Sequence, residues 1–296
     1  MASPQYETFA ASVAAQRTAT LPSLEELRAG MDLLIQTLPA PDGTTVMPVD
    51  AGGVPAEWVA SARAGEKHVV IHLHGGGYCI GSAASIRNFA GRVSAAAEAR
   101  VLSVDYRLAP EHPFPAAVSD AVAAYRWVLA QGISPSRISL SGESAGGGLV
   151  VALLVALRDA GDPLPACAVP ISPWVDMENS GEMSEIARAQ DLLRIEHIEL
   201  FARTYLNGSD PRDPLASPLH ADLSGLPPLL VLVGGREILL DDARRLTLRA
   251  QEAGVDCTLR IVPEMIHFWN LFGPLFPEAT LASEDVAEFV RSHVAA

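Results

Sequence analysis

Basic residues are scarce in this chain of 296 residues. Lysine and arginine together number 21, against 35 aspartates and glutamates, which gives a formal net charge of −14. A chain of this charge repels phosphate backbones and anionic lipid surfaces, and no run of lysine or arginine reverses that effect locally. We therefore expect no nucleic-acid partner.

Cysteines and long apolar runs are also scarce. The three cysteines, Cys79, Cys167 and Cys257, are odd in number and form no CxxC pair, so neither a disulfide framework nor a zinc knuckle is indicated. Reduced thiols fit a cytoplasmic protein best. No stretch approaches the roughly 18 consecutive apolar residues of a membrane helix, and the N-terminal residues lack the pattern of a signal peptide. We expect a cytoplasmic protein with no membrane span.

Hydrophobic residues make up 49% of the chain, which rules out a wholly disordered protein. From about residue 46 onward, short apolar runs typical of buried strands alternate with helical patterns. Strands are expected at 68–73, 100–106, 137–141, 166–171, 229–233 and 256–262, and helices at 120–131, 145–159, 239–253 and 281–294. This alternation predicts an α/β fold with a mainly parallel central sheet and helices on both faces.

Two segments depart from the alternation. Residues 1–36 have helical character with no strand before them, and Ser23 with Glu26 forms the pattern of a capping box. Residues 177–209 are helical and charged, and they are too long for a simple crossover between two strands. Such segments would cover the carboxyl ends of the strands, where open α/β sheets bind ligands. We expect two units: a helical cap of residues 1–36 and 177–209, and an α/β domain of residues 37–176 and 210–296.

The strongest chemical signal is the GxSxG motif Gly142-Glu143-Ser144-Ala145-Gly146, which follows an expected strand and opens an expected helix. A sharp strand-to-helix turn strains the middle residue and exposes its hydroxyl, and side chains two positions before and after it would clash. The helix N-terminus leaves free N–H groups beside the hydroxyl. The motif predicts Ser144 as a nucleophile, and the alternative is a glycine-rich turn capped by this serine.

A second signal, His74-Gly75-Gly76-Gly77-Tyr78, follows the strand expected at 68–73. Consecutive glycines let backbone N–H groups approach a ligand, and such groups stabilise the negative oxygen that develops when a carbonyl is attacked. An ordinary flexible turn is the alternative. A phosphate loop is excluded because GK[ST] and GxGxxG are absent. His72 and His74 could form a metal pair, but no neighbouring cluster of acids and histidines completes it, so we expect no metal.

With Asp105–Ala117 (DYRLAPEHPFPAA), the HGGGY and GESAGGG motifs make the chain resemble the bacterial hormone-sensitive-lipase group of α/β-hydrolase esterases, from about residue 45 to the end. The resemblance implies a capped α/β-hydrolase fold that hydrolyses carboxylic esters, usually with short acyl chains, without a cofactor. It implies that the N–H groups of Gly76, Gly77 and Ala145 form the oxyanion hole. It also implies a supporting role for Asp105–Ala117 and, as a frequent state of the group, a homodimer.

The base is expected to be a histidine that follows the acid in the chain. Of the eight histidines, only His267 and His293 follow a plausible acid, and His293 lies in the last expected helix. His267 lies in the loop after the strand at 256–262, which can direct it toward Ser144. The resemblance places the histidine of the group in a similar context, here His267-Phe268-Trp269. A structural histidine in an apolar stretch is the alternative.

The acid departs from the D-x-L-x-D-[DE] pattern of the group. The chain reads GGREILLDD from Gly234, so the resemblance places Glu237 at the acid position and Asp241 and Asp242 at the later ones. A glutamate can accept the histidine N–H, fix its tautomer and stabilise the imidazolium. Asp241 is the rival, one helical turn later on the same face. Whichever residue is not the acid would stabilise the N-terminus of the following helix.

Together these residues predict a serine carboxylesterase with a small-molecule ester as its partner. Ser144 attacks, His267 acts as the base, Glu237 orients it, and water releases an acyl-enzyme. The alternatives are a lactone hydrolase or acyltransferase with the same triad, and a non-catalytic ligand-binding protein of the same fold.

Side chains beside these motifs carry further expectations. We expect Glu143 to tie neighbouring loops together, and we expect Cys79 to be buried rather than nucleophilic. Four aromatic residues are equally suited to lining an acyl pocket and to packing in the cap and core: Phe201, Tyr205, Phe268 and Trp269.

Overall fold

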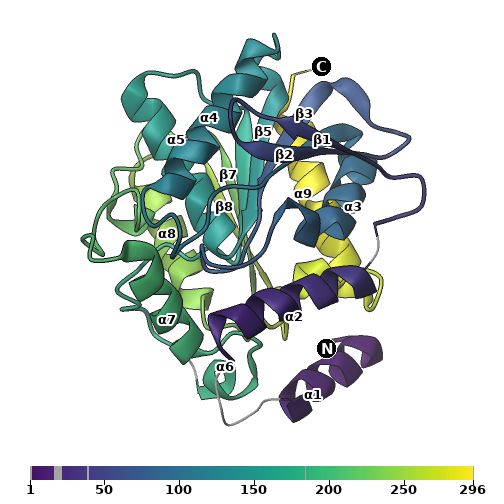
Figure 1. The fold of residues 1–296 in the computed structure, drawn as a ribbon, viewed down its shortest axis with the longest axis vertical. Helices are drawn as coiled ribbons and strands as arrows, with labels where there is room; N and C mark the ends of the chain where they lie inside the picture. Colours follow the sequence, from purple (N-terminus) through teal and green to yellow (C-terminus); the bar gives the residue numbers. More distant parts are fainter. Residues whose placement is uncertain (1, 17–21, 39, 184, 296) are drawn as a thin grey trace.

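A computed structural model of the chain describes residues 2–16, 22–38, 40–183 and 185–295, so residues 1, 17–21 and 184 of the expected cap, and residues 39 and 296, lie outside the described residues. The described residues form an eight-stranded sheet with helices on both faces (Figure 1). The strands are β1 (Thr45–Asp50), β2 (Pro55–Ala60), β3 (Gly65–Leu73), β4 (Ala99–Val104), β5 (Ile138–Glu143), β6 (Cys167–Ile171), β7 (Leu229–Gly234) and β8 (Cys257–Val262). The helices are α1 (Pro4–Gln16), α2 (Leu24–Thr37), α3 (Arg87–Ala97), α4 (Ala116–Ala130), α5 (Ala145–Ala160), α6 (Glu185–Gln190), α7 (Ile195–Leu206), α8 (Leu240–Glu252) and α9 (Pro277–His293), with 3₁₀ turns at Ala83–Ile86, Pro135–Arg137, Pro218–His220 and Trp269–Phe272.

The sheet has the strand order β1-β2-β4-β3-β5-β6-β7-β8. β1 pairs with β2 and β2 pairs with β4 in antiparallel fashion, while the other neighbours are parallel. Leu73 at the end of β3 lies in register with Gly142 near the end of β5. The two glycine-containing motifs therefore leave the sheet side by side, although nearly 70 residues separate them in the sequence.

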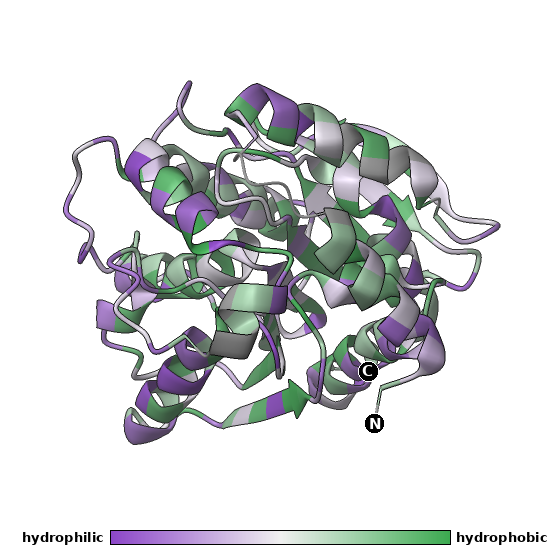
Figure 2. Cartoon of the chain, turned by 90° about the horizontal axis from the view of Figure 1, so that it is seen from below, coloured by the Kyte–Doolittle hydropathy of each residue, from purple (hydrophilic) through white to green (hydrophobic). Residues whose placement is uncertain are grey.

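Helices cover the two faces of the sheet in the way that the apolar strand patterns predict. Val69, Ile71 and Leu73 of β3 belong to the core that α4, α5 and α8 complete, whereas Val70 belongs to the core beneath α3 and α9. Successive residues of a strand point to opposite faces, so a strand covered on both sides must be apolar throughout. Figure 2 shows hydrophilic residues concentrated on the outward sides of the surrounding helices. The prediction of an α/β fold with a mainly parallel sheet and helices on both faces is confirmed.

The helices α1, α2, α6 and α7 lie at one end of the molecule, at the bottom of Figure 1. The predicted capping box of α2 is confirmed: the Ser23 N–H donates to Glu26 Oε2 at 2.7 Å, and the Glu26 N–H donates to Ser23 Oγ at 3.2 Å. Arg28 fixes α2 to the rest of the molecule by donating from Nε to the Cys79 carbonyl at 2.9 Å and by pairing with Glu111. The exact division into cap and α/β domain stays a prediction.

The sequence patterns did not reveal every element. The antiparallel strands β1 and β2 and the helix α3 were not individually predicted. Helix α9 begins at Pro277, four residues before the prediction, since proline is well suited to the first helical turn. None of the helices in the described ranges combines the length and the apolar character needed to cross a membrane.

Packing at the centre of the fold can be tested with a pair of leucines. Leu154 of α5 is fully buried, whereas Leu248 of α8 is 59% exposed. Leu154→Ala is expected to lower the free energy of unfolding by about 2–5 kcal/mol, because it removes buried methyl groups and leaves a cavity. Leu248→Ala is the matched control and should change it by no more than about 0.5 kcal/mol. Urea unfolding measures both, and equal losses would contradict this account of the core.

Candidate active site

Ser144 lies at the turn between β5 and α5 with a strained backbone of φ 57° and ψ −121°. Such a conformation costs a non-glycine residue about 1–3 kcal/mol, so the surroundings must hold it. The Ser144 N–H donates to the Ile171 carbonyl at 2.9 Å, and the Ser144 carbonyl accepts from the N–H groups of Gly148 and Trp174, each at 3.0 Å. The Ser144 hydroxyl makes no capping hydrogen bond to α5, so the alternative of a serine-capped turn is wrong.

The two glycines of the GxSxG motif lie where no side chain fits. A Cβ atom on Gly142 would lie 2.5 Å from the carbonyl oxygen of Gly146, and one on Gly146 would lie 2.0 Å from the carbonyl oxygen of Leu73. These distances are far shorter than any Cβ contact tolerates, so the strand end and the first turn of α5 approach each other only through glycine. The steric explanation of the motif is confirmed.

His267 follows β8 and is completely buried against Ser144. Its Nε2 lies 2.8 Å from Ser144 Oγ, and its Nδ1 lies 2.6 Å from Glu237 Oε2. A neutral ring facing a carboxylate on one side and a hydroxyl on the other carries its proton on Nδ1 and accepts at Nε2. Burial alone would lower the pKa of His267, but the hydrogen bond and charge of Glu237, with the charge of Asp191, outweigh burial and raise this pKa.

Glu237 follows β7, and its carboxylate is fixed on both oxygens. Oε1 accepts from the Ser172 hydroxyl at 2.7 Å and from the Gly234 N–H, which leaves Oε2 for the histidine. The rival Asp241 lies in the first turn of α8 and accepts instead from the Glu182 N–H at 3.1 Å. His293, at the end of α9, hydrogen-bonds to the Phe289 carbonyl of its own helix at 2.8 Å. The structure therefore brings Ser144, His267 and Glu237 together and places Asp241 and His293 elsewhere.

Gly76 and Gly77 form a tight loop after β3, with φ values of 115° and 61°. A Cβ atom on Gly76 would lie 2.2 Å from the Ile80 carbonyl oxygen, and one on Gly77 would lie 2.3 Å from the Phe201 ring of α7. Within the described ranges, the N–H groups of Gly76, Gly77 and Ala145 donate to no protein acceptor. Gly76 and Gly77 line the same cavity as Ser144, so N–H donors are available beside the serine hydroxyl.

Glu143 ties the two glycine-containing turns together, as predicted. Its Oε1 accepts from the Gly75 N–H at 2.6 Å, and its Oε2 lies 2.6 Å from His72 Nε2. The other ring nitrogen of His72 lies 3.2 Å from Ser141 Oγ. Both nitrogens of His72 are thus engaged, so a metal pair with His74 would have to break one of these contacts.

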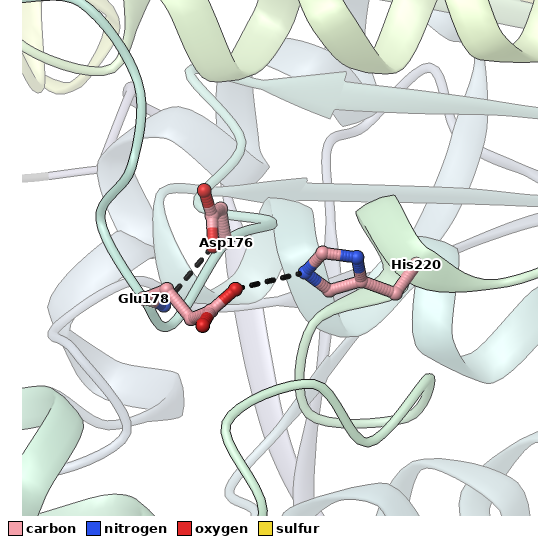
Figure 3. A group of neighbouring side chains, drawn as sticks. All are labelled: Asp176, Glu178 and His220. Atoms are coloured by element: carbon pink, nitrogen blue, oxygen red, sulfur yellow. Dashed lines mark hydrogen bonds and ion pairs between the residues drawn. The ribbon is translucent and has the colours of Figure 1, made fainter.

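Asp176, Glu178 and His220 form a group with ligand atoms within 4.8 Å of one another (Figure 3). The oxygens of Asp176 already accept several hydrogen bonds, including one from the Glu178 N–H at 3.0 Å and one from Arg245 Nη1 at 2.9 Å. A metal ion would have to displace this guanidinium, which already neutralises the buried carboxylate. We therefore assign no metal to this group.

An apolar cavity of about 330 Å³ opens above Ser144. Its walls include Leu27 and Met31 from α2 and Ile198 and Phe201 from α7. Of the four aromatic residues with two expected roles, Phe201 and Phe268 line the cavity, whereas Tyr205 and Trp269 are buried in packing. Tyr205 stacks on Tyr78 with ring centroids 3.8 Å apart.

Cys79 is completely buried beside the glycine loop, as predicted. Burial raises the pKa of its thiol to about 12, so the thiolate that a nucleophilic cysteine needs is not formed near neutral pH.

Two residues that the sequence patterns did not single out also contact the site. Ser172 donates to Glu237, and Asp191 accepts from the His267 N–H at 2.7 Å. No local motif marks either residue, because both contacts depend on the tertiary fold.

Comparisons with known proteins agree with this fold and site. A family model described as an alpha/beta hydrolase fold matches residues 70–271. An acetyl-hydrolase of Streptomyces hygroscopicus is 49% identical over 245 residues, with 82% of each chain covered. An esterase of Acinetobacter venetianus is 35% identical over 268 residues, covering 90% of this chain and 88% of its own. A crystal structure of an esterase from the bacterial hormone-sensitive lipase family is 46% identical, with a TM-score of 0.95 and complete coverage of both chains.

The fold and the matching family model define the class of protein, an α/β hydrolase. Identities of this level over most of each chain narrow the class: the chain belongs to the bacterial hormone-sensitive lipase family. It is an enzyme, a carboxylic ester hydrolase, which leaves aside the alternative of a non-catalytic binding protein.

The requirement for glycine at the serine turn can be tested against a glycine in open space. Gly146→Ala is expected to lower the free energy of unfolding by about 1–3 kcal/mol or more, because its methyl group overlaps the Leu73 carbonyl. Gly30→Ala, in α2, has no atom within 4 Å of its new methyl group. This control should raise the free energy of unfolding by about 0.4–1 kcal/mol. Urea unfolding distinguishes the two, and a neutral Gly146→Ala would contradict the packing described here.

Proposed function

We propose that the protein hydrolyses short-chain carboxylic esters through a covalent acyl-enzyme on Ser144. The observation that carries this proposal is the buried series of hydrogen bonds from Ser144 Oγ through His267 to Glu237, next to an apolar cavity. In this series a hydroxyl faces a proton acceptor, and a carboxylate holds that acceptor in the required tautomer. Such an arrangement activates a serine for attack on a carbonyl.

In the first half of the reaction, Ser144 Oγ bonds to the ester carbonyl carbon as its proton moves to His267 Nε2. The carbonyl oxygen becomes an oxyanion, and the N–H groups of Gly76, Gly77 and Ala145 are proposed to stabilise it. When the carbon–oxygen bond of the leaving group breaks, the alcohol takes the proton from Nε2. Glu237 stabilises the imidazolium that exists between these two transfers, which is the state that its charge favours.

In the second half, a water molecule replaces the alcohol. The water oxygen bonds to the acyl carbon as His267 takes a proton from the water, and the bond between the acyl carbon and Ser144 Oγ then breaks. The serine recovers its proton from Nε2 and the carboxylic acid leaves. A lactone hydrolase would differ only in the leaving group, and an acyltransferase only in the molecule that accepts the acyl group. The proposal commits to an open ester as the substrate and to water as the acceptor.

The preference for short acyl chains is supported by the size of the cavity. Its volume of about 330 Å³ is near the lower end of the range of about 300–1,000 Å³ that ligand pockets occupy. Helices α2 and α7 supply much of its apolar wall, in agreement with the proposed cap of residues 1–36 and 177–209. The cytoplasmic location and the homodimer stay predictions.

Replacing the proposed nucleophile tests the function directly. Ser144→Ala is expected to lower kcat for a short p-nitrophenyl ester by at least about a thousandfold, because no oxygen remains to form the acyl-enzyme. It should also abolish labelling by a fluorophosphonate probe. The circular dichroism spectrum serves as the control for an intact fold. Undiminished turnover by a folded variant would refute the assignment.

The acid can be identified with two matched variants. Glu237→Gln is expected to lower kcat about 10²- to 10⁴-fold, because an amide neither stabilises the imidazolium nor enforces the tautomer. Asp241→Asn removes the carboxylate at the start of α8 but should keep kcat within about threefold, since this carboxylate accepts from the Glu182 N–H and not from His267. Steady-state kinetics on one ester decide between them. A larger loss for Asp241→Asn would show that the acid is misassigned.

A further inference from the structure

Asp191 is a completely buried carboxylate in the segment between α6 and α7. Its Oδ1 accepts from the backbone N–H of His267 at 2.7 Å, and its Oδ2 accepts from the backbone N–H of Ile238 at 2.8 Å. The first donor belongs to the proposed base itself, and the second belongs to the residue that follows the proposed acid. One side chain therefore joins the loop after β8 to the loop after β7.

A charged Asp191 is unusual at a completely buried position. Within the described residues no lysine or arginine forms an ion pair with it. Burial raises its pKa to about 7, and the charge of Glu237 acts in the same direction, while the two N–H bonds and His267 oppose the rise. A buried carboxylate without a cation is costly unless a specific interaction retains it.

The interaction that offsets the cost of burying Asp191 is the attraction between its charge and the imidazole ring of His267. Three acidic groups surround His267: Glu237 from the loop after β7, Asp191 from the segment before α7, and Glu143 from β5. All three favour the imidazolium over the neutral ring. Asp191 binds the main chain, so it leaves Nδ1 to Glu237 and Nε2 to Ser144.

We propose that Asp191 is a positioning residue for catalysis, an inference that rests on the proposed function. Through two backbone N–H groups it holds the loop of His267 and the loop of Glu237 in register. It also adds negative charge beside the imidazolium. The same segment shapes the substrate site, because Leu192 and Leu193 line the cavity. The Asp191 N–H also donates to the Ala187 carbonyl at 2.9 Å, which ties the carboxylate to the end of α6. Packing around the substrate is thereby linked to the geometry of the base.

The decisive variant is Asp191→Asn. An amide of the same shape accepts only one of the two N–H bonds and brings its own NH₂ against the other, and it carries no charge. We expect kcat for a short p-nitrophenyl ester to fall about 10- to 100-fold while KM stays within about threefold. The pKa of His267 should fall when a negative neighbour is removed, so the acidic limb of the kcat/KM profile should move to lower pH.

A second buried aspartate provides the matched control. Asp242 accepts two backbone N–H groups with Oδ2, from Val175 at 3.0 Å and from Asp176 at 3.2 Å, and burial likewise raises its pKa to about 7. Within the described residues no hydrogen bond joins it to His267 or Glu237. Asp242→Asn should therefore leave kcat and the acidic limb at their wild-type values. Because one amide oxygen can keep both N–H bonds, it should lower the thermal unfolding midpoint no more than Asp191→Asn does.

The outcomes separate the two proposals. If Asp191→Asn is folded and keeps both the wild-type kcat and the wild-type pH profile, the role of Asp191 is refuted. The same conclusion follows if Asp242→Asn moves kcat and the acidic limb equally. If Asp191→Asn does not fold, Asp191→Ser, which leaves space for water to bind both N–H groups, is measured in the same way. A wild-type protein that neither hydrolyses the ester nor reacts with a fluorophosphonate would instead refute the proposed function.

Discussion

The strained backbone of Ser144, at φ 57° between β5 and α5, is the constraint on which the neighbouring loops and strands of the site depend. The turn exists because Gly142 and Gly146 let the end of β5 and the start of α5 approach the carbonyl of Leu73. That approach places the loop after β3 beside the serine, so its glycines share a cavity with the hydroxyl. The backbone bonds of Ser144 to Ile171 and Trp174 then fix the turn to β6 and the segment after it. The strain is local, but the sheet register maintains it.

The acidic groups around the imidazole of His267 all favour its protonated form. Burial would keep His267 neutral, whereas Glu237, Asp191 and Glu143 favour its charged form. These carboxylates do not compete for the same atoms, because they bind a ring nitrogen, a backbone N–H and the glycine loop respectively. The site thus stabilises a positive charge at the one place where the proposed reaction creates it, and each acid is also used to hold a loop. Charge and geometry are supplied by the same side chains.

The extent to which the sequence predicts this site depends on the distance over which each signal acts. Ser144 and the glycine loop lie in compact motifs whose steric reasons are local, so they could be found by reading short segments. His267 required the chain order of the fold, and the choice between Glu237 and Asp241 rested on alignment alone, because both acids share a helical face in the sequence pattern. In the structure the Glu237 carboxylate lies against the His267 ring, whereas the Asp241 carboxylate accepts from the Glu182 N–H. Asp191 and Ser172 could not be found, because no local motif marks them and their partners, 76 and 65 residues away, come near only in the tertiary fold.

Helices α2 and α7 do more than line the cavity above Ser144. Phe201 of α7 packs where a side chain on Gly77 would lie, and Arg28 of α2 binds the carbonyl of Cys79 in the same loop. Asp191, from the segment before α7, accepts from the main-chain N–H of His267. The helical segments therefore contact the glycine loop after β3 on one side of the serine and the histidine loop after β8 on the other. A substitution there that changes the cavity also changes the contacts of these two loops, so the shape of the cavity and the support of Ser144 and His267 are physically coupled.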